Sequence, residues 1–186
     1  MNDPHDPVPD DMRPRAPKID GLDAQQKTHG RRLALIHDMH LRQLAAVRNV
    51  MEQVAAGQAS TKRLNEAVSS IQMTHNYRQF GALCGQECAV LTSHHTIEDE
   101  SIFPALSGCD EGLQSVIERL IVEHGVIHEL LEQLQAAARQ LVDRPADEAF
   151  ARVQKHFSRI ESAVRSHFGY EQEELADALG YWNIAV

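Results

Sequence analysis

The chain has 186 residues, a length that suits one compact domain, and 42% of them are hydrophobic, as in ordinary soluble domains. Its formal net charge of −9 gives no basic footprint for nucleic acid, and no apolar run approaches the roughly 20 residues that span a bilayer. Aromatic residues make up only 5%, which favours helical packing over a β-sandwich. No charged-then-apolar signal segment opens the chain and three cysteines suggest no disulfide framework, so we expect a cytoplasmic protein.

The first 29 residues are predicted to form a flexible N-terminal arm. Five of the seven prolines fall within the first 17 residues, and proline does not continue a helix. Apolar residues with helical spacing begin only near Gly30. We therefore expect the folded domain to comprise residues 30–186.

Four amphipathic helices are predicted after this arm. Apolar residues repeat at three- and four-residue steps over about residues 30–57, 68–98, 113–141 and 150–171. The second helix should stop before Pro104, and Pro145 lies in the break between the third and the fourth. Short connections imply antiparallel neighbours, so the expected fold is an all-α, up-down-up-down four-helix bundle.

Histidine and glutamate residues lie on the apolar stripes of these helices. They are His37, His94, Glu98, His124, His128, His167 and Glu171. Three of the helices carry a pair four residues apart, a spacing that places both side chains on one helix face. Imidazole and carboxylate groups are costly to bury unless something pairs with them, so this set predicts a bound cation. Five imidazoles and two carboxylates exceed the four ligands of a structural zinc, and two metals fit better.

Two further histidines leave the ligand set open. His40 could take the place of His37 if the first helix were rotated slightly about its axis. His95 could be a third ligand from the second helix, a hydrogen-bond partner of a ligand, or a residue on the solvent side.

Two tyrosines and two cysteines are expected mainly in the core. Tyr77 and Tyr170 could also lie near the metals as hydrogen-bond donors or phenolate ligands. Cys84 and Cys88 are typical of small core hydrophobes rather than of a redox pair.

Three segments resemble blocks of the haemerythrin-like (HHE cation-binding) family: HHTIEDESIFPAL, EHGVIHELL and HFGYEQEE. The resemblance covers about residues 31–179 and implies a bundle with a bridged non-haem di-iron centre. It implies that Glu98 and Glu171 bridge the two irons. It further implies that one iron is bound by His124, His128 and His167, and the other by His37 and His94.

The resemblance implies a protein that binds or reacts with a small oxidant such as O2, peroxide or NO. Oxygen or redox sensing and peroxide detoxification are the roles expected, and a catalase-like or NO-reducing activity would need an acid-base group near the metals. The alternative is a metal-storage or regulatory module without catalysis. Mn or Zn could use many of the same ligands as iron, and the sequence leaves the oligomeric state open.

Overall fold

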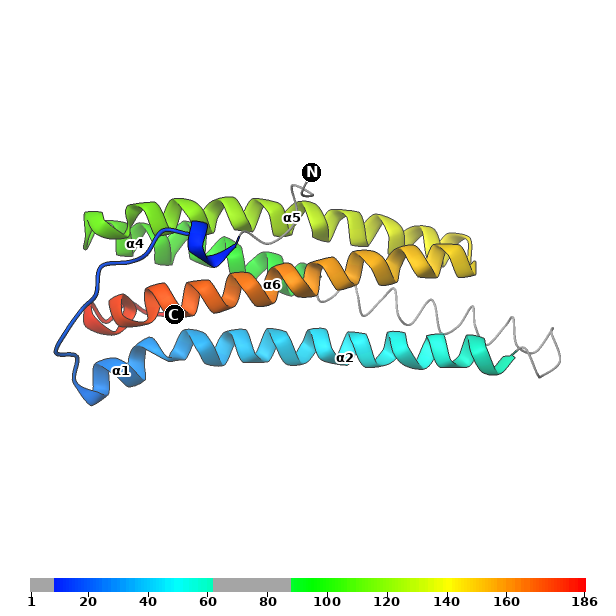
Figure 1. Cartoon of the computed structure of the whole chain (residues 1–186), viewed down its shortest axis with the longest axis horizontal. Coiled ribbons are helices and arrows are strands. Elements are labelled where there is room, and N and C mark those ends of the chain that lie inside the picture. Colours follow the sequence, from blue (N-terminus) through cyan, green and yellow to red (C-terminus); the bar gives the residue numbers. More distant parts are fainter. Residues whose placement is uncertain (1–8, 62–87) are drawn as a thin grey trace.

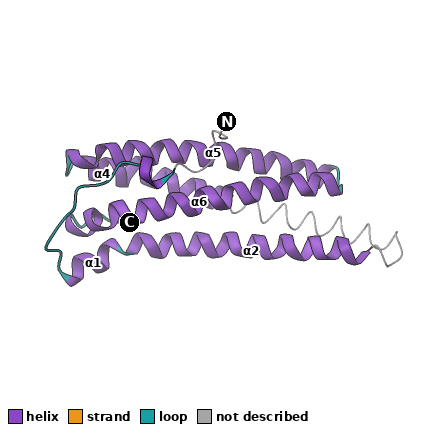
Figure 2. Cartoon of the chain, viewed as in Figure 1, coloured by secondary structure: helices purple, strands orange, loops and turns teal. Residues whose placement is uncertain are grey.

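The computed structural model of the chain describes residues 9–61 and 88–186. Every regular element in those two ranges is helical, as the colours of Figure 2 show. The helices are α1 (Ala24–Gly30), α2 (Arg32–Thr61), α4 (Phe103–Ser107), α5 (Gln114–Asp143) and α6 (Asp147–Tyr181), with 3-10 turns η1 (Asp10–Met12) and η3 (Glu111–Leu113). Residues 88–97 are also helical, and a π-helical turn, η2 (Glu98–Ile102), joins them to α4.

The helices form an antiparallel bundle. Figure 1 shows α2, α5 and α6 side by side along the long axis, with α5 and α6 running in opposite directions on either side of the short turn between them. The helical residues 88–107 supply the fourth position of the bundle. The predicted all-α four-helix bundle is confirmed. Within the described ranges, no helix combines the length and the apolar character needed to cross a membrane.

The second predicted helix differs from expectation at its end. It continues through Pro104 to Ser107 instead of stopping before the proline, because η2 intervenes and the Phe103 N–H donates to the Glu98 carbonyl. Pro104 then lies in the first turn of α4, where a missing N–H costs little. The earlier part of this predicted helix, with Tyr77 and Cys84, lies outside the described residues.

The predicted N-terminal arm also differs from expectation over its described part. Residues 24–29 belong to α1, which begins at a capping box: the Asp23 side chain accepts from the Gln26 N–H, and the Gln26 side chain accepts from the Asp23 N–H. Before α1, Arg13 and Leu22 are buried. The prolines keep this stretch out of a helix, but an extended segment can still lie against a bundle.

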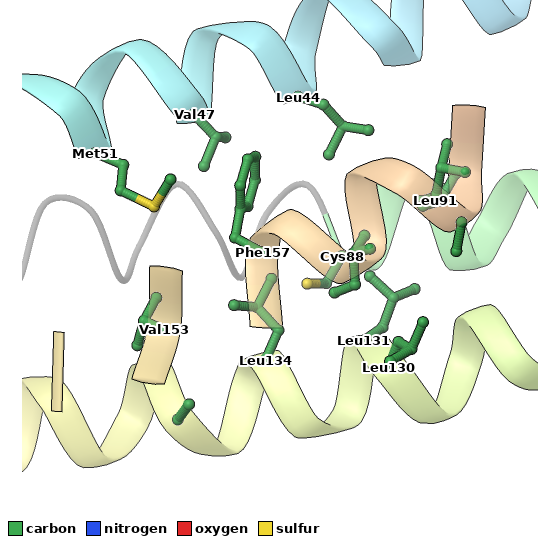
Figure 3. Packing of buried hydrophobic residues seen from close by; sticks show 14 of the residues in the cluster. Leu44, Val47, Met51, Cys88, Leu91, Leu130, Leu131, Leu134, Val153 and Phe157 are labelled. Carbon is green, nitrogen blue, oxygen red and sulfur yellow. The ribbon is translucent and has the colours of Figure 1, made fainter. Parts of the chain in front are cut away.

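Two apolar clusters fill the bundle, one in each half. The cluster in Figure 3 includes Leu44, Leu91, Leu131 and Phe157, and it occupies the half in which α5 ends and α6 begins. The other cluster lies in the half near α1. It contains Leu33, Ile102, Phe103, Leu106, Leu113, Val116, Ile117, Leu120, Tyr170, Leu175, Ala178 and Leu179. On each helix, the histidines and glutamates singled out above, except His128, lie where residues of one cluster give way to residues of the other.

Glycines allow α1 to lie closely against α6. A Cβ atom added at Gly180 would overlap the carbonyl oxygen of Gln26, and one added at Gly30 would overlap the carbonyl oxygen of Ala176. Both obstacles are backbone atoms, which cannot rotate away as a flexible side chain could.

Gly180→Ala should therefore lower the free energy of unfolding by about 1 to 3 kcal/mol, because α1 must move off α6. Gly169→Ala on the same helix is the matched control: nothing lies within 4 Å of its added Cβ, so it should be neutral or stabilise by up to about 1 kcal/mol. Urea unfolding followed by circular dichroism measures both. Equal effects of the two substitutions would contradict close packing at Gly180.

Candidate metal centre

A layer of buried polar side chains separates the two apolar clusters. Glu98, Glu171 and His37 are 0% exposed. The layer also contains His40, His95, His124 and His167, which are buried, and His94, whose side chain is 9% exposed. All four positions of the bundle contribute to it. Such a concentration of polar groups inside a core requires partners for them.

One group in this layer consists of His37, His94 and Glu98. Each offers one potential ligand atom, and these atoms lie within 4.8 Å of one another. The Nε2 atom of His94 is 3.2 Å from Glu98 Oε1, and the Nε2 atom of His37 is 3.8 Å from the same oxygen. This group contains two imidazoles and one carboxylate around a common point.

A second group consists of His95, His124 and His167, whose nearest ligand atoms also lie within 4.8 Å of one another. The Nε2 atoms of His124 and His167 are 3.0 Å apart. Two ligand atoms about 2.1 Å from one cation and at right angles to each other are about 3 Å apart, so this spacing fits two ligands of one ion. The ring of His95 stacks on that of His124 with centroids 4.1 Å apart.

The two carboxylates lie between the two groups. Glu98 Oε1 faces His94, whereas Glu98 Oε2 is 3.5 Å from His124 Nε2. Glu171 Oε2 is 3.3 Å from His37 Nε2 and 3.7 Å from His167 Nε2. Each carboxylate therefore contacts an imidazole of both groups, which is the arrangement that bridging ligands need.

Several atoms of this layer make no hydrogen bond with the described part of the chain. They are Nε2 of His37 and of His94, both ring nitrogens of His95, and all four carboxylate oxygens of Glu98 and Glu171. A buried polar group left unsatisfied costs about 1 to 3 kcal/mol. Cations between these atoms would satisfy most of them at once.

The electrostatics of the layer suit a cation. Burial lowers the pKa of His94 to about 3 and also lowers the pKa values of His95 and His167, so these imidazoles are neutral near pH 7. Neutral imidazole is the form that binds metals. Burial, and next the neighbouring Glu171 carboxylate, raise the pKa of Glu98. A cation would stabilise both carboxylates in the charged form.

The far nitrogens of the imidazoles contact polar side chains. His124 Nδ1 lies 2.8 Å from Asp99 Oδ1, and His37 Nδ1 lies 2.8 Å from the carboxamide nitrogen of Gln172. Metal-binding histidines typically donate the other ring N–H to an acceptor, which fixes ring orientation, and Asp99 is such an acceptor for His124. For His37 to bind a metal through Nε2, the Gln172 carboxamide would present its oxygen to Nδ1, because the amide nitrogen is only a donor. Asp99 and Gln172 each directly follow a glutamate of the layer, Glu98 and Glu171, and their sequence positions alone did not single them out.

Glu123 plays the corresponding part for His167, with its Oε2 atom 3.2 Å from His167 Nδ1. Burial alone would raise the pKa of Glu123, but hydrogen bonds from His167, Arg13 and Arg119 outweigh it and lower the pKa to about 2. Glu123 is therefore a carboxylate that accepts from His167. Its place beside Leu120 and Ile127 on the apolar stripe was a signal that sequence reasoning missed.

His128 is the one predicted ligand that the structure keeps out of this layer. Its side chain is exposed, in contrast to the expectation that it shares a buried face with His124. Four residues rotate a helix position by roughly 40°, and the buried stripe of α5 is centred on the other side of His124, toward Glu123 and Ile127. His95, buried against His124, occupies the third histidine position of that group.

The structure also gives the positions of the residues whose roles the sequence left open. His37 contacts both carboxylates, and His40 is buried beside His94 with ring centroids 4.7 Å apart. Tyr170 donates a hydrogen bond to the Pro14 carbonyl and packs in the core. Cys88 is buried in the apolar cluster of Figure 3, as predicted.

Comparison with known proteins agrees with this geometry. The model of the Hemerythrin HHE cation binding domain matches residues 29–179, which is most of the chain. Searches among curated proteins and among solved structures found no match. The matched range contains every histidine and glutamate of the buried layer, so the chain belongs to the haemerythrin HHE cation-binding domain family.

Proposed function

We propose that this cation-binding domain holds two iron ions and uses them to bind or react with a small oxidant. The observation that carries the proposal is the position of Glu98 and Glu171, each in contact with imidazoles of both groups. A single cation would need only one of the groups. Two carboxylates shared between two sets of imidazoles suit a pair of divalent ions.

The ligands would divide between the ions by group. One ion would lie among His95, His124 and His167, and the other beside His37 and His94, with Glu98 and Glu171 shared by both. This set replaces His128 of the sequence-based assignment by His95. Imidazole and carboxylate also suit Mn and Zn, so metal content decides the identity of the ions.

The ion beside His37 and His94 would have one imidazole fewer than the ion among His95, His124 and His167, which leaves it more room for a small ligand. A pocket of about 330 Å3 lies on this side and is lined by His40 and His94 among mostly apolar residues. Its apolar lining includes Leu33, Ile36, Met39, Val90, Ile97 and Ile102. O2, peroxide and NO are small enough to enter such a pocket. An iron pair held by these residues would supply electrons to such an oxidant, or a position at which it binds.

Among the residues that the structure describes, we propose His40 as the one that moves a proton near the bound oxidant. It lines the pocket and lies beside His94, with the two ring centroids 4.7 Å apart. His95 belongs to the ligand groups, and Tyr170 is turned toward Pro14. A histidine within reach of the reacting group contributes typically 10²- to 10⁴-fold to a proton-transfer step. We propose a peroxide-consuming or oxidant-sensing role in a reducing cytoplasm.

Anaerobic reconstitution with Fe(II) should give about two irons per chain, and hydrogen peroxide should then change the visible and near-ultraviolet spectrum. Glu171→Ala removes a shared ligand and should lose both irons, whereas Glu173→Ala, two residues away and more than half exposed, should keep them. Elemental analysis measures the content. One zinc per chain, or no metal, would contradict the di-iron proposal, and many irons per chain would favour storage.

His95→Ala and His128→Ala form a second matched pair. The first should lower iron content or Fe(II) affinity by at least about 10-fold, because a ligand is removed, and the second should leave both unchanged. Competition with a coloured Fe(II) chelator measures affinity. The opposite result, with His128 essential and His95 dispensable, would show that the sequence-based ligand set was correct.

His40→Gln separates an enzyme from a sensor. If the iron-loaded protein consumes peroxide, this substitution should slow turnover by about 10-fold or more while iron content stays at the wild-type value. Oxygen release and peroxide absorbance give the rate. A stable adduct with no turnover in the wild-type protein would exclude the enzyme role and leave oxidant sensing.

A further inference from the structure

We infer that residues 9–17, here called the docked segment, support the metal centre through Arg13. Arg13 of this segment holds the Glu123 carboxylate that orients His167, so metal binding and docking of the segment stabilise each other. The inference rests on the proposed function, since it takes His167 to be a metal ligand. It assigns Arg13 and Glu123 as positioning residues.

The guanidinium of Arg13 donates two hydrogen bonds to the Glu123 carboxylate. Its Nε atom donates to Oε1 at 2.9 Å, and a terminal nitrogen donates to Oε2 at 3.0 Å. Arg13 is only 7% exposed, although it comes from a segment that crosses the outside of the bundle. Paired hydrogen bonds between arginine and a carboxylate are among the strongest and most directional in proteins. This contact fixes the orientation of Glu123 as well as its charge.

Glu123, held by Arg13, in turn restricts the orientation of His167. Its Oε2 atom, which accepts from Arg13, also lies 3.2 Å from His167 Nδ1. Arg119 donates to the other oxygen at 2.8 Å from the same helix. Partners of metal-binding histidines typically affect metal affinity by 10- to 100-fold when mutated. Arg13 therefore acts on the metal centre through one intervening carboxylate.

Other contacts seat the docked segment on α6 without reaching the ligands. Arg13 lies over the Tyr170 ring, 4.7 Å from its centroid, and the Tyr170 hydroxyl donates to the Pro14 carbonyl at 2.8 Å. One turn further along, Glu174 accepts from the Ala16 N–H at 2.5 Å and from Arg15 at 2.7 Å. Figure 1 shows this part of the chain lying across α5 and α6.

The coupling must act in both directions. A cation bound at His167 Nε2 leaves the proton on Nδ1, where it donates to Glu123 and favours the geometry that Arg13 recognises. A docked Arg13 in turn prepares His167 for the cation. If docking raises metal affinity by some factor, metal raises the stability of docking by the same factor. The segment would thus leave the bundle more readily when the metals are absent.

Arg13→Gln and Arg15→Gln test this inference as a matched pair, because both remove an arginine that anchors the segment but only Arg13 contacts Glu123. Fe(II) affinity is measured anaerobically with a competing chelator, and hydrogen exchange of residues 9–20 is followed with and without Fe(II). We expect Arg13→Gln to lower affinity 10- to 100-fold and Arg15→Gln to change it less than threefold. Iron should slow exchange of the segment in the wild-type protein and in Arg15→Gln, but not in Arg13→Gln.

Arg13→Lys keeps the charge without the two-pronged geometry, and we expect it to lose affinity too, by a smaller factor. Circular dichroism of each metal-free variant confirms that the bundle is folded. Unchanged affinity in Arg13→Gln would overturn the inference. An equal loss in Arg15→Gln would overturn it too, because the contact of Arg13 with Glu123 would then not be what links the segment to the metal centre. If the wild-type protein binds no iron, the proposed function fails and the inference fails with it; if it binds iron and Arg13→Gln equals it, the inference alone fails.

Discussion

The energetic cost of two buried carboxylates is the constraint on which the rest of this structure depends. Glu98 and Glu171 are 0% exposed, and their oxygens make no hydrogen bond within the described ranges. Leaving even one of them charged and unpaired between two apolar clusters would take a large share of the 5 to 15 kcal/mol by which proteins of this size are typically stable. Cations shared by the two carboxylates, as we propose, would turn this cost into a stabilising interaction.

Helix geometry explains how one chain supplies two groups of candidate metal ligands. Residues four apart lie on the same face, so His94 with Glu98 and His167 with Glu171 each deliver an imidazole and a shared carboxylate. Adjacent residues on a helix are about 100° apart, so neighbouring His94 and His95 point to different groups. The doubled histidine is thus how one helix serves both sides of the carboxylate pair.

The polar layer also connects the interior of the bundle with its outside. Imidazoles of the layer contact Asp99, Glu123 and Gln172, and Glu123 in turn contacts Arg13 of the docked segment. His40 of α2 and His94 of the helical residues 88–97 line a pocket. The centre therefore has one side reinforced by the N-terminal segment and another side suited to entry of a small ligand.

Much of the fold could be predicted from the sequence because it depends on local periodicity. The apolar stripes predicted the first, third and fourth helices, and most of the predicted ends lie within a few residues of the observed ones. The exception is the end of α6, which continues ten residues past Glu171. Pro104 was misleading because a π turn precedes it. Spacing also located His37, His94, Glu98, His124, His167 and Glu171, which the structure brings together.

The remaining features depend on rotation and on contacts distant in sequence. The four-residue rule pairs His128 with His124 but does not tell which edge of the stripe is buried, so His128 was included and Glu123 was overlooked. The position of His95 could be assigned only once the packing of α5 against the helix of His95 was known, because its ring stacks on that of His124. Arg13 lies in a segment whose prolines suggested a flexible arm, and its role depends on a partner, Glu123, that is 110 residues away in the sequence. No local pattern carries that information.

Anomalous diffraction from crystals of the iron-loaded protein would test the central claim most directly. The claim is that two ions lie in the polar layer and share Glu98 and Glu171. We expect two anomalous peaks, one among His95, His124 and His167 and one beside His37 and His94, with the carboxylates between them. A single peak, or a peak bound by His128, would contradict this account.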